Sequence, residues 1–77
     1  AAPLFKHSGI IFVVDSSDRN KIGTIKHELH DILKDKHLKK AVLLIFANKQ
    51  DRPGAMNIVE ISEGLGLKHL KHRKYKV

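Results

Sequence analysis

Two uninterrupted apolar runs constrain the fold of this chain more than any other feature. Residues 10–14 read IIFVV and residues 41–47 read AVLLIFA. Apolar runs of this length, without alternating polar residues, are typical of strands in parallel sheets, which are covered on both faces. Neither run approaches the roughly 20 residues that a membrane-spanning helix needs. We therefore predict two buried strands, at 9–15 and 41–47.

The segment between the two strands has the pattern of an amphipathic helix. Apolar residues recur at intervals of three or four positions, at Ile22, Ile25, Leu29 and Ile32. Charged residues and histidines occupy most of the positions between them, as on the exposed face of a surface helix. We predict a helix over 18–37.

A second, shorter helix is predicted at 57–66. Asn57 and Glu60 have the spacing of a capping box, in which each side chain bonds the backbone N–H of the other residue. Gly66 stands where a glycine commonly ends a helix. The remaining residues, 68–77, form a basic tail whose structure the pattern leaves open.

The order strand–helix–strand–helix indicates the fold class. Two buried strands joined through a helix favour parallel pairing within an α/β sheet. The chain has 77 residues and only two predicted strands, whereas parallel sheets usually have more. We predict an incomplete, β-α-β-α portion of a doubly wound parallel sheet of the P-loop NTPase type. A protein partner or a second copy of the chain would complete the sheet.

A polar motif, NKQD at residues 48–51, follows the second strand directly. Ligands of open α/β sheets bind outside the carboxyl ends of the strands. Asp51 could accept two hydrogen bonds from guanine, Lys49 could lay its methylene stem over the base, and Asn48 could contact both base and neighbouring loops. We predict that Asn48, Lys49 and Asp51 bind a guanine base.

The sequence around this motif resembles the ADP-ribosylation factor family of small GTPases. GIIFVVDSSDR at residues 9–19 is similar to the family's fourth strand, and AVLLIFANKQD at residues 41–51 to its fifth strand and guanine-specificity loop. Further matches follow in order up to residue 73. The resemblance implies GTP or GDP binding with Mg²⁺, and a role in vesicle trafficking at membranes such as the Golgi. The absence of cysteine fits a cytoplasmic protein.

The chain also departs from the family pattern. It contains no GxxxxGK[ST] motif, so no residue is predicted to cradle phosphates or to bind Mg²⁺. The switch segments, the sixth strand and the final helix have no counterparts. We therefore predict no catalytic residue and no metal ligand, and we expect the 77 residues alone to hydrolyse no GTP. Base binding through the NKQD loop should be millimolar or weaker (roughly −4 kcal/mol or less).

The net charge of +7 favours acidic partners. Residues 68–77 could bind an anionic membrane surface, although a run of charges is more often simply solvated. Two hypotheses follow. The chain is part of an Arf-like GTP-binding protein, for which nucleic acid is not an expected partner. Alternatively it is a non-enzymatic basic module that binds acidic lipid, nucleic acid or a protein.

Two groups of polar residues have competing interpretations. Asp15, at the end of the first strand, either caps the following helix or organises the turn, and the helix-cap reading is favoured. His27 and His30 have a spacing that can bind zinc, as do His69 and His72. Since no further ligand is placed with either pair, we interpret these histidines as solvated surface residues.

Overall fold

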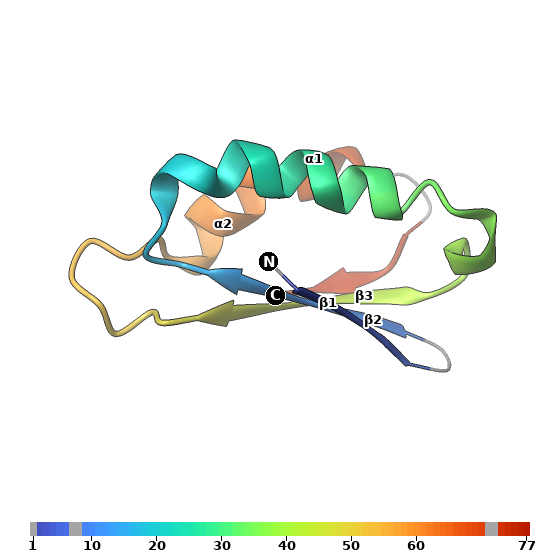
Figure 1. Cartoon of the computed structure of the whole chain (residues 1–77), viewed down its shortest axis with the longest axis horizontal. Coiled ribbons are helices and arrows are strands. Elements are labelled where there is room, and N and C mark those ends of the chain that lie inside the picture. The colour runs from blue at the N-terminus through green and yellow to red at the C-terminus, as the bar shows by residue number, and fades with distance from the viewer. Residues whose placement is uncertain (1, 7–8, 71–72) are drawn as a thin grey trace.

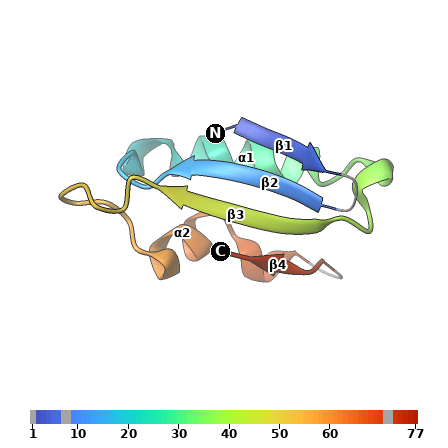
Figure 2. The same ribbon diagram turned by 90° about the horizontal axis from the view of Figure 1, so that it is seen from below.

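A four-stranded sheet organises the chain in the computed structural model, which describes residues 2–6, 9–70 and 73–77. The strands are β1 (Ala2–Lys6), β2 (Gly9–Asp15), β3 (Val42–Asn48) and β4 (Tyr75–Lys76). Their order across the sheet is β1-β2-β3-β4, as Figure 2 shows. Strands β2, β3 and β4 are parallel, which confirms the predicted α/β class.

Strand β1 is not among the elements that the sequence pattern predicts. It pairs antiparallel with β2, and Ala2 lies opposite Val13 while Lys6 lies opposite Gly9. The segment contains Pro3, which cannot donate to a neighbouring strand and is therefore suited to the edge of a sheet. Its place at that edge explains how a strand can form around a proline.

The first helix is shorter than predicted. Instead of running over 18–37, α1 spans Ile22–Ile32, between the short 3₁₀ turns η1 (Arg19–Lys21) and η2 (Lys36–Leu38). The helix cannot continue through Asp35, because that residue has extended backbone angles and its side chain accepts a hydrogen bond from the backbone N–H of His37. Aspartate competes with helical hydrogen bonding in this way at caps and turns.

Helix α2 (Ile58–Gly64) is shorter than the predicted range 57–66. Asn57 is its N-cap and accepts a hydrogen bond from the N–H of Glu60 (2.8 Å), while Glu60 accepts one from the N–H of Asn57 (3.1 Å). The predicted capping box is thus present. Gly66 follows the helix with φ +63°, a left-handed conformation that glycine adopts without steric cost.

The basic tail, whose structure the sequence pattern leaves open, is partly structured. Residues 67–69 form the 3₁₀ turn η3, and β4 adds a short strand beside β3. In this pairing Tyr75 lies opposite Leu43, whose N–H donates to the carbonyl oxygen of Lys74 (2.9 Å). The tail therefore extends the sheet by one strand.

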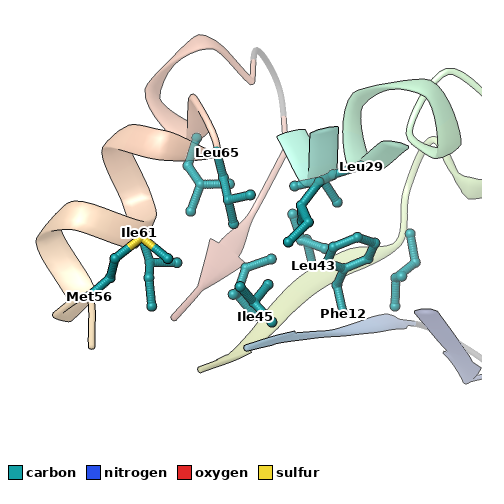
Figure 3. Close-up of a cluster of buried hydrophobic side chains, with 11 residues drawn as sticks. Phe12, Leu29, Leu43, Ile45, Met56, Ile61 and Leu65 are labelled. Atoms are coloured by element: carbon teal, nitrogen blue, oxygen red, sulfur yellow. The ribbon is translucent and has the colours of Figure 1, made fainter. Parts of the chain in front are cut away.

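Both helices cover the same face of the sheet (Figure 1). Alternate residues of β2 and β3 point into the core between sheet and helices, where Figure 3 shows Phe12, Leu43 and Ile45 facing Leu29 and Ile61. Complete burial of one large apolar side chain stabilises the fold by about 1.5–3 kcal/mol. The core therefore depends on the alternation of side chains along β2 and β3, in which every second residue points toward the helices.

In the described part of the chain no helix covers the opposite face of the sheet (Figure 1), so the predicted burial of both strand faces is wrong for this chain. Val42, Leu44 and Phe46 of β3 point away from the helices and are exposed. That a protein partner or a second copy of the chain completes the sheet stays a prediction. None of the helices in the described part of the chain is long and apolar enough to cross a membrane.

Substitution of two phenylalanines on opposite faces of the sheet tests whether the core lies on one side of the sheet only. Phe12 is completely buried, whereas Phe46 is 55% exposed. We expect Phe12→Ala to cost about 3–5 kcal/mol, as much as the whole net stability of a core this small. Phe46→Ala should cost about 1 kcal/mol or less. Urea unfolding followed by circular dichroism measures both, and equal losses would contradict the one-sided core.

Candidate functional site

The carboxyl ends of β2 and β3 lie side by side at one edge of the sheet. Asp15 and Asn48, the last residues of the two strands, are partners in the parallel register. The backbone N–H of Ser16 extends the pairing by donating to the carbonyl oxygen of Asn48 (2.9 Å). In Figure 2 both arrowheads point to this edge, so the loops after the two strands begin next to each other.

Asp15 organises the turn after β2. Its Oδ1 accepts hydrogen bonds from the backbone N–H of Ser17 (2.9 Å) and from the Ser17 hydroxyl (2.6 Å). This pattern is an Asx turn, in which the side chain bonds the backbone two residues on. The helix-cap interpretation of Asp15 is therefore wrong, and the turn-organising one is confirmed. Asp18 is the N-cap of the following 3₁₀ turn η1, and its side chain makes no capping hydrogen bond.

Lys49 joins the two loops. Its Nζ lies 3.3 Å from Oδ2 of Asp15, across the edge of the sheet. The two hydrogen bonds from Ser17, helped by the nearby Lys49 ammonium, lower the pKa of Asp15 to about 2. Asp15 is therefore a carboxylate throughout the neutral range, and it holds the lysine over the end of β2.

The backbone of Lys49 has a conformation that is uncommon for a residue with a side chain. Its φ of +60° is the only positive value among the non-glycine residues described. Such a conformation costs of order 1–3 kcal/mol and persists when surrounding contacts hold it. Here the side-chain Oδ1 of Asn48 accepts from the Lys49 N–H (3.0 Å), and the Asp15 contact holds the other end of the residue.

The rest of the loop is held by backbone contacts. The Arg52 N–H donates to the carbonyl oxygen of Lys49 (3.2 Å), and the Met56 N–H donates to that of Ser16 (2.7 Å). Gln50 donates from Nε2 to the Met56 carbonyl oxygen (3.4 Å). Asp51 lies between these anchored positions and is exposed. Its side chain is therefore accessible to solvent, in the same loop as Lys49.

An ion pair that the sequence pattern does not reveal braces the far end of the loop. Arg19 pairs with Glu60, and its Nε donates to the carbonyl oxygen of Gly54 (2.8 Å). Glu60 thus serves both the capping box of α2 and the loop after β3. The helix-cap spacing pointed to Glu60, but nothing in the spacing of Arg19 indicates a partner 41 residues away.

The histidines do not form a metal site in the described part of the chain, where no group of three or more potential ligands is found. His27 and His69 are exposed, as their interpretation as surface residues predicts. That interpretation is wrong for His30, which is half-buried and donates from Nε2 to the carbonyl oxygen of Leu65 (2.7 Å). His72 lies outside the described residues.

The predicted site residues are close in sequence but differ in setting. Asn48 ends β3, Lys49 is fixed in its strained conformation, and Asp51 projects from the loop. The contact between Lys49 and Asp15 is an addition that sequence reasoning missed. The sequence could have indicated this contact, because Asp15 ends β2 and the NKQD motif begins at the end of β3. Strands that pair in parallel end at the same edge of a sheet.

Parallel strands with helices between them, and polar loops at their carboxyl ends, place the chain among α/β proteins with an incomplete P-loop NTPase-like fold. A sequence model of the ADP-ribosylation factor family matches residues 4–77. The match covers nearly the entire chain. The chain therefore belongs to the ADP-ribosylation factor family, and it is an Arf-like small GTP-binding protein.

The lowered pKa of Asp15 predicts a pH dependence of stability. Because its pKa is about 2 in the folded chain against 3.8 in an unfolded one, its contribution is complete above about pH 4 and is lost as the pH falls toward 2. We expect Asp15→Asn to flatten the fall in stability over this window. Urea unfolding across the window measures it, with Asp31→Asn on the exposed side of α1 as the control. An unchanged slope for Asp15→Asn would contradict the role of this carboxylate.

Proposed function

We propose that the loop after β3 binds the guanine base of GTP or GDP through Asn48, Lys49 and Asp51. The observation that carries this proposal is the contact between Lys49 and Asp15, which orients the lysine, while Asp51, two residues further along the same loop, is exposed. A fixed cation and an exposed carboxylate at the carboxyl edge of a parallel sheet form a suitable frame for a planar polar ligand.

Asp51 supplies the selectivity for guanine. Its carboxylate can accept one hydrogen bond from the ring N1–H and a second from the exocyclic 2-amino group. Adenine has no donors in this arrangement and would leave the carboxylate unpaired. Sites built on such hydrogen bonds discriminate strongly, since an unpaired polar group costs about 1–3 kcal/mol when it is desolvated.

Lys49 and Asn48 provide the surrounding contacts. With its ammonium held at Asp15, the methylene stem of Lys49 is available to cover one face of the base. The side-chain oxygen of Asn48 is engaged by the Lys49 N–H, which leaves its amide hydrogens to donate to acceptors on the base. Both residues thus complement the acceptor role of Asp51.

The proposal assigns base recognition, and no phosphate or Mg²⁺ contact, to these 77 residues. The support is the sequence, which contains no GxxxxGK[ST] motif. In P-loop proteins phosphate and metal contacts perform the catalysis, so we propose that this chain alone hydrolyses no GTP. We extend the proposal to a role in vesicle-mediated transport at a cytoplasmic membrane surface such as the Golgi, on the ground of the family match.

A change of base preference tests the role of Asp51. In Asp51→Asn the new amide can still accept from N1–H but would donate where guanine also donates. Xanthine has a carbonyl oxygen at that position and should be preferred by the variant. We expect the chain to bind GDP more tightly than xanthosine diphosphate, and Asp51→Asn to reverse this order by about tenfold or more.

NMR titration of the chain with each nucleotide measures this preference. Asp31→Asn serves as the matched control, because it makes the same chemical change on the exposed side of α1. A variant that retains its preference for GDP would contradict the role of Asp51. Micromolar affinity for GDP with Mg²⁺ would contradict the millimolar affinity that we expect from base contacts alone.

A further inference from the structure

The end of the molecule opposite the NKQD loop contains an open cavity of about 690 Å³. It lies between the segment that follows α1 and the residues at the starts of β3 and β4. This is the end of the molecule that carries the turn η2, drawn in green in Figure 1. Its size is within the range of about 300–1,000 Å³ that is usual for small-ligand sites. Residues 33–36 and 39–42, together with residues 73–74 far away in the sequence, supply its lining.

The lining of this basic cavity concentrates the positive charge of the chain. Its basic residues are Lys34, Lys36, Lys39, Lys40, Arg73 and Lys74, and its one acidic residue is Asp35. The lining therefore carries a charge of +5, out of a net +7 for the chain. A hollow lined by charges of one sign focuses the electrostatic field and concentrates counter-ions.

Arg73 builds the wall of the cavity. Its guanidinium donates to the carbonyl oxygens of Ala41 (2.7 Å) and Leu33 (3.3 Å), and also to that of Leu38. These contacts tie the segment after η3 to the turn after α1. They also occupy carbonyl oxygens whose negative ends would otherwise repel an anion, so the wall presents positive charge.

Four of the five lysines of the cavity form no ion pair with a neighbouring acid in the described part of the chain. Lys34 lies 3.9 Å from Asp31, but Lys36, Lys39, Lys40 and Lys74 form no ion pair within the described part of the chain. Lys34 can be explained by the C-terminal dipole of α1, which ends at Ile32 and acts only over the last turn of a helix. The four other lysines lie beyond that range, so their clustering favours an anionic ligand.

We propose that the basic cavity binds a compact ligand that carries two or more phosphate groups. Several dianionic groups match a charge of +5 better than one carboxylate does, and lysine is a common ligand of phosphate. The charges surround one hollow instead of following a stripe across a surface, and this arrangement fits a compact polyanion better than an extended nucleic acid. The ligand is either a phosphorylated lipid headgroup or a free polyphosphorylated molecule.

This site is separate from the proposed guanine site. The cavity includes Val42 at the start of β3, while the NKQD motif begins at Asn48 at its end. The six residue steps from Val42 to Asn48 along the strand separate the two by about 20 Å. A ligand in the basic cavity therefore does not touch the guanine loop, and the two proposals can fail independently.

Calorimetric titration with inositol trisphosphate at about 0.1 M ionic strength tests the proposal. We expect the triple substitution Lys36→Gln, Lys39→Gln and Lys40→Gln to weaken binding by about tenfold or more. The matched control substitutes Lys21, Lys26 and Lys68 by Gln, which removes the same charge from exposed positions outside the cavity. The control should weaken binding much less. Asp51→Asn should leave it unchanged.

Vesicles distinguish the two sources of the ligand. Phosphatidylcholine vesicles containing phosphatidylinositol bisphosphate are compared with phosphatidylserine vesicles of equal total charge. Cavity-dependent binding to the bisphosphate vesicles identifies a lipid headgroup, and cavity-dependent binding to inositol trisphosphate alone identifies a soluble ligand. Equal losses in the two triple variants, equal binding to both kinds of vesicle without a response to inositol trisphosphate, or no binding to any probe would overturn the proposal.

Discussion

The parallel pairing of β2 with β3 is the constraint on which the rest of the structure depends. It runs over the full length of both strands, from Gly9 opposite Val42 to Asp15 opposite Asn48. One register therefore aligns the buried residues that form the core and brings the two polar loops to the same edge. A shift by one residue would turn the core side chains of one of the two strands to the wrong face and would part Lys49 from Asp15.

The elements of the fold that depend on local patterns could be predicted from the sequence. The apolar runs gave β2 and β3, and the spacing of Asn57 and Glu60 gave the cap of α2. The elements that depend on distant contacts could not be predicted in this way. Strand β4 is too short to have a pattern, and β1 is defined by its pairing with β2.

The same division holds for the candidate site. The NKQD motif identifies its residues because their chemistry suits guanine and because they follow a buried strand. The ion pair of Lys49 with Asp15 spans 34 positions, and that of Arg19 with Glu60 spans 41. No periodicity in the sequence reports contacts at such separations. They follow only once the register of β2 and β3 is known.

Binding of a nucleoside monophosphate, followed by amide NMR shifts, tests the central claim most directly. If the loop after β3 recognises guanine, GMP should shift the amides around Asp15–Ser17 and Asn48–Arg52, with half-saturation in the millimolar range (roughly −4 kcal/mol). AMP should leave the same amides unchanged, because adenine lacks the adjacent N1–H and 2-amino donors that Asp51 would bind. Equal shifts with both nucleotides, or GMP shifts confined to other parts of the chain, would contradict guanine recognition by this loop.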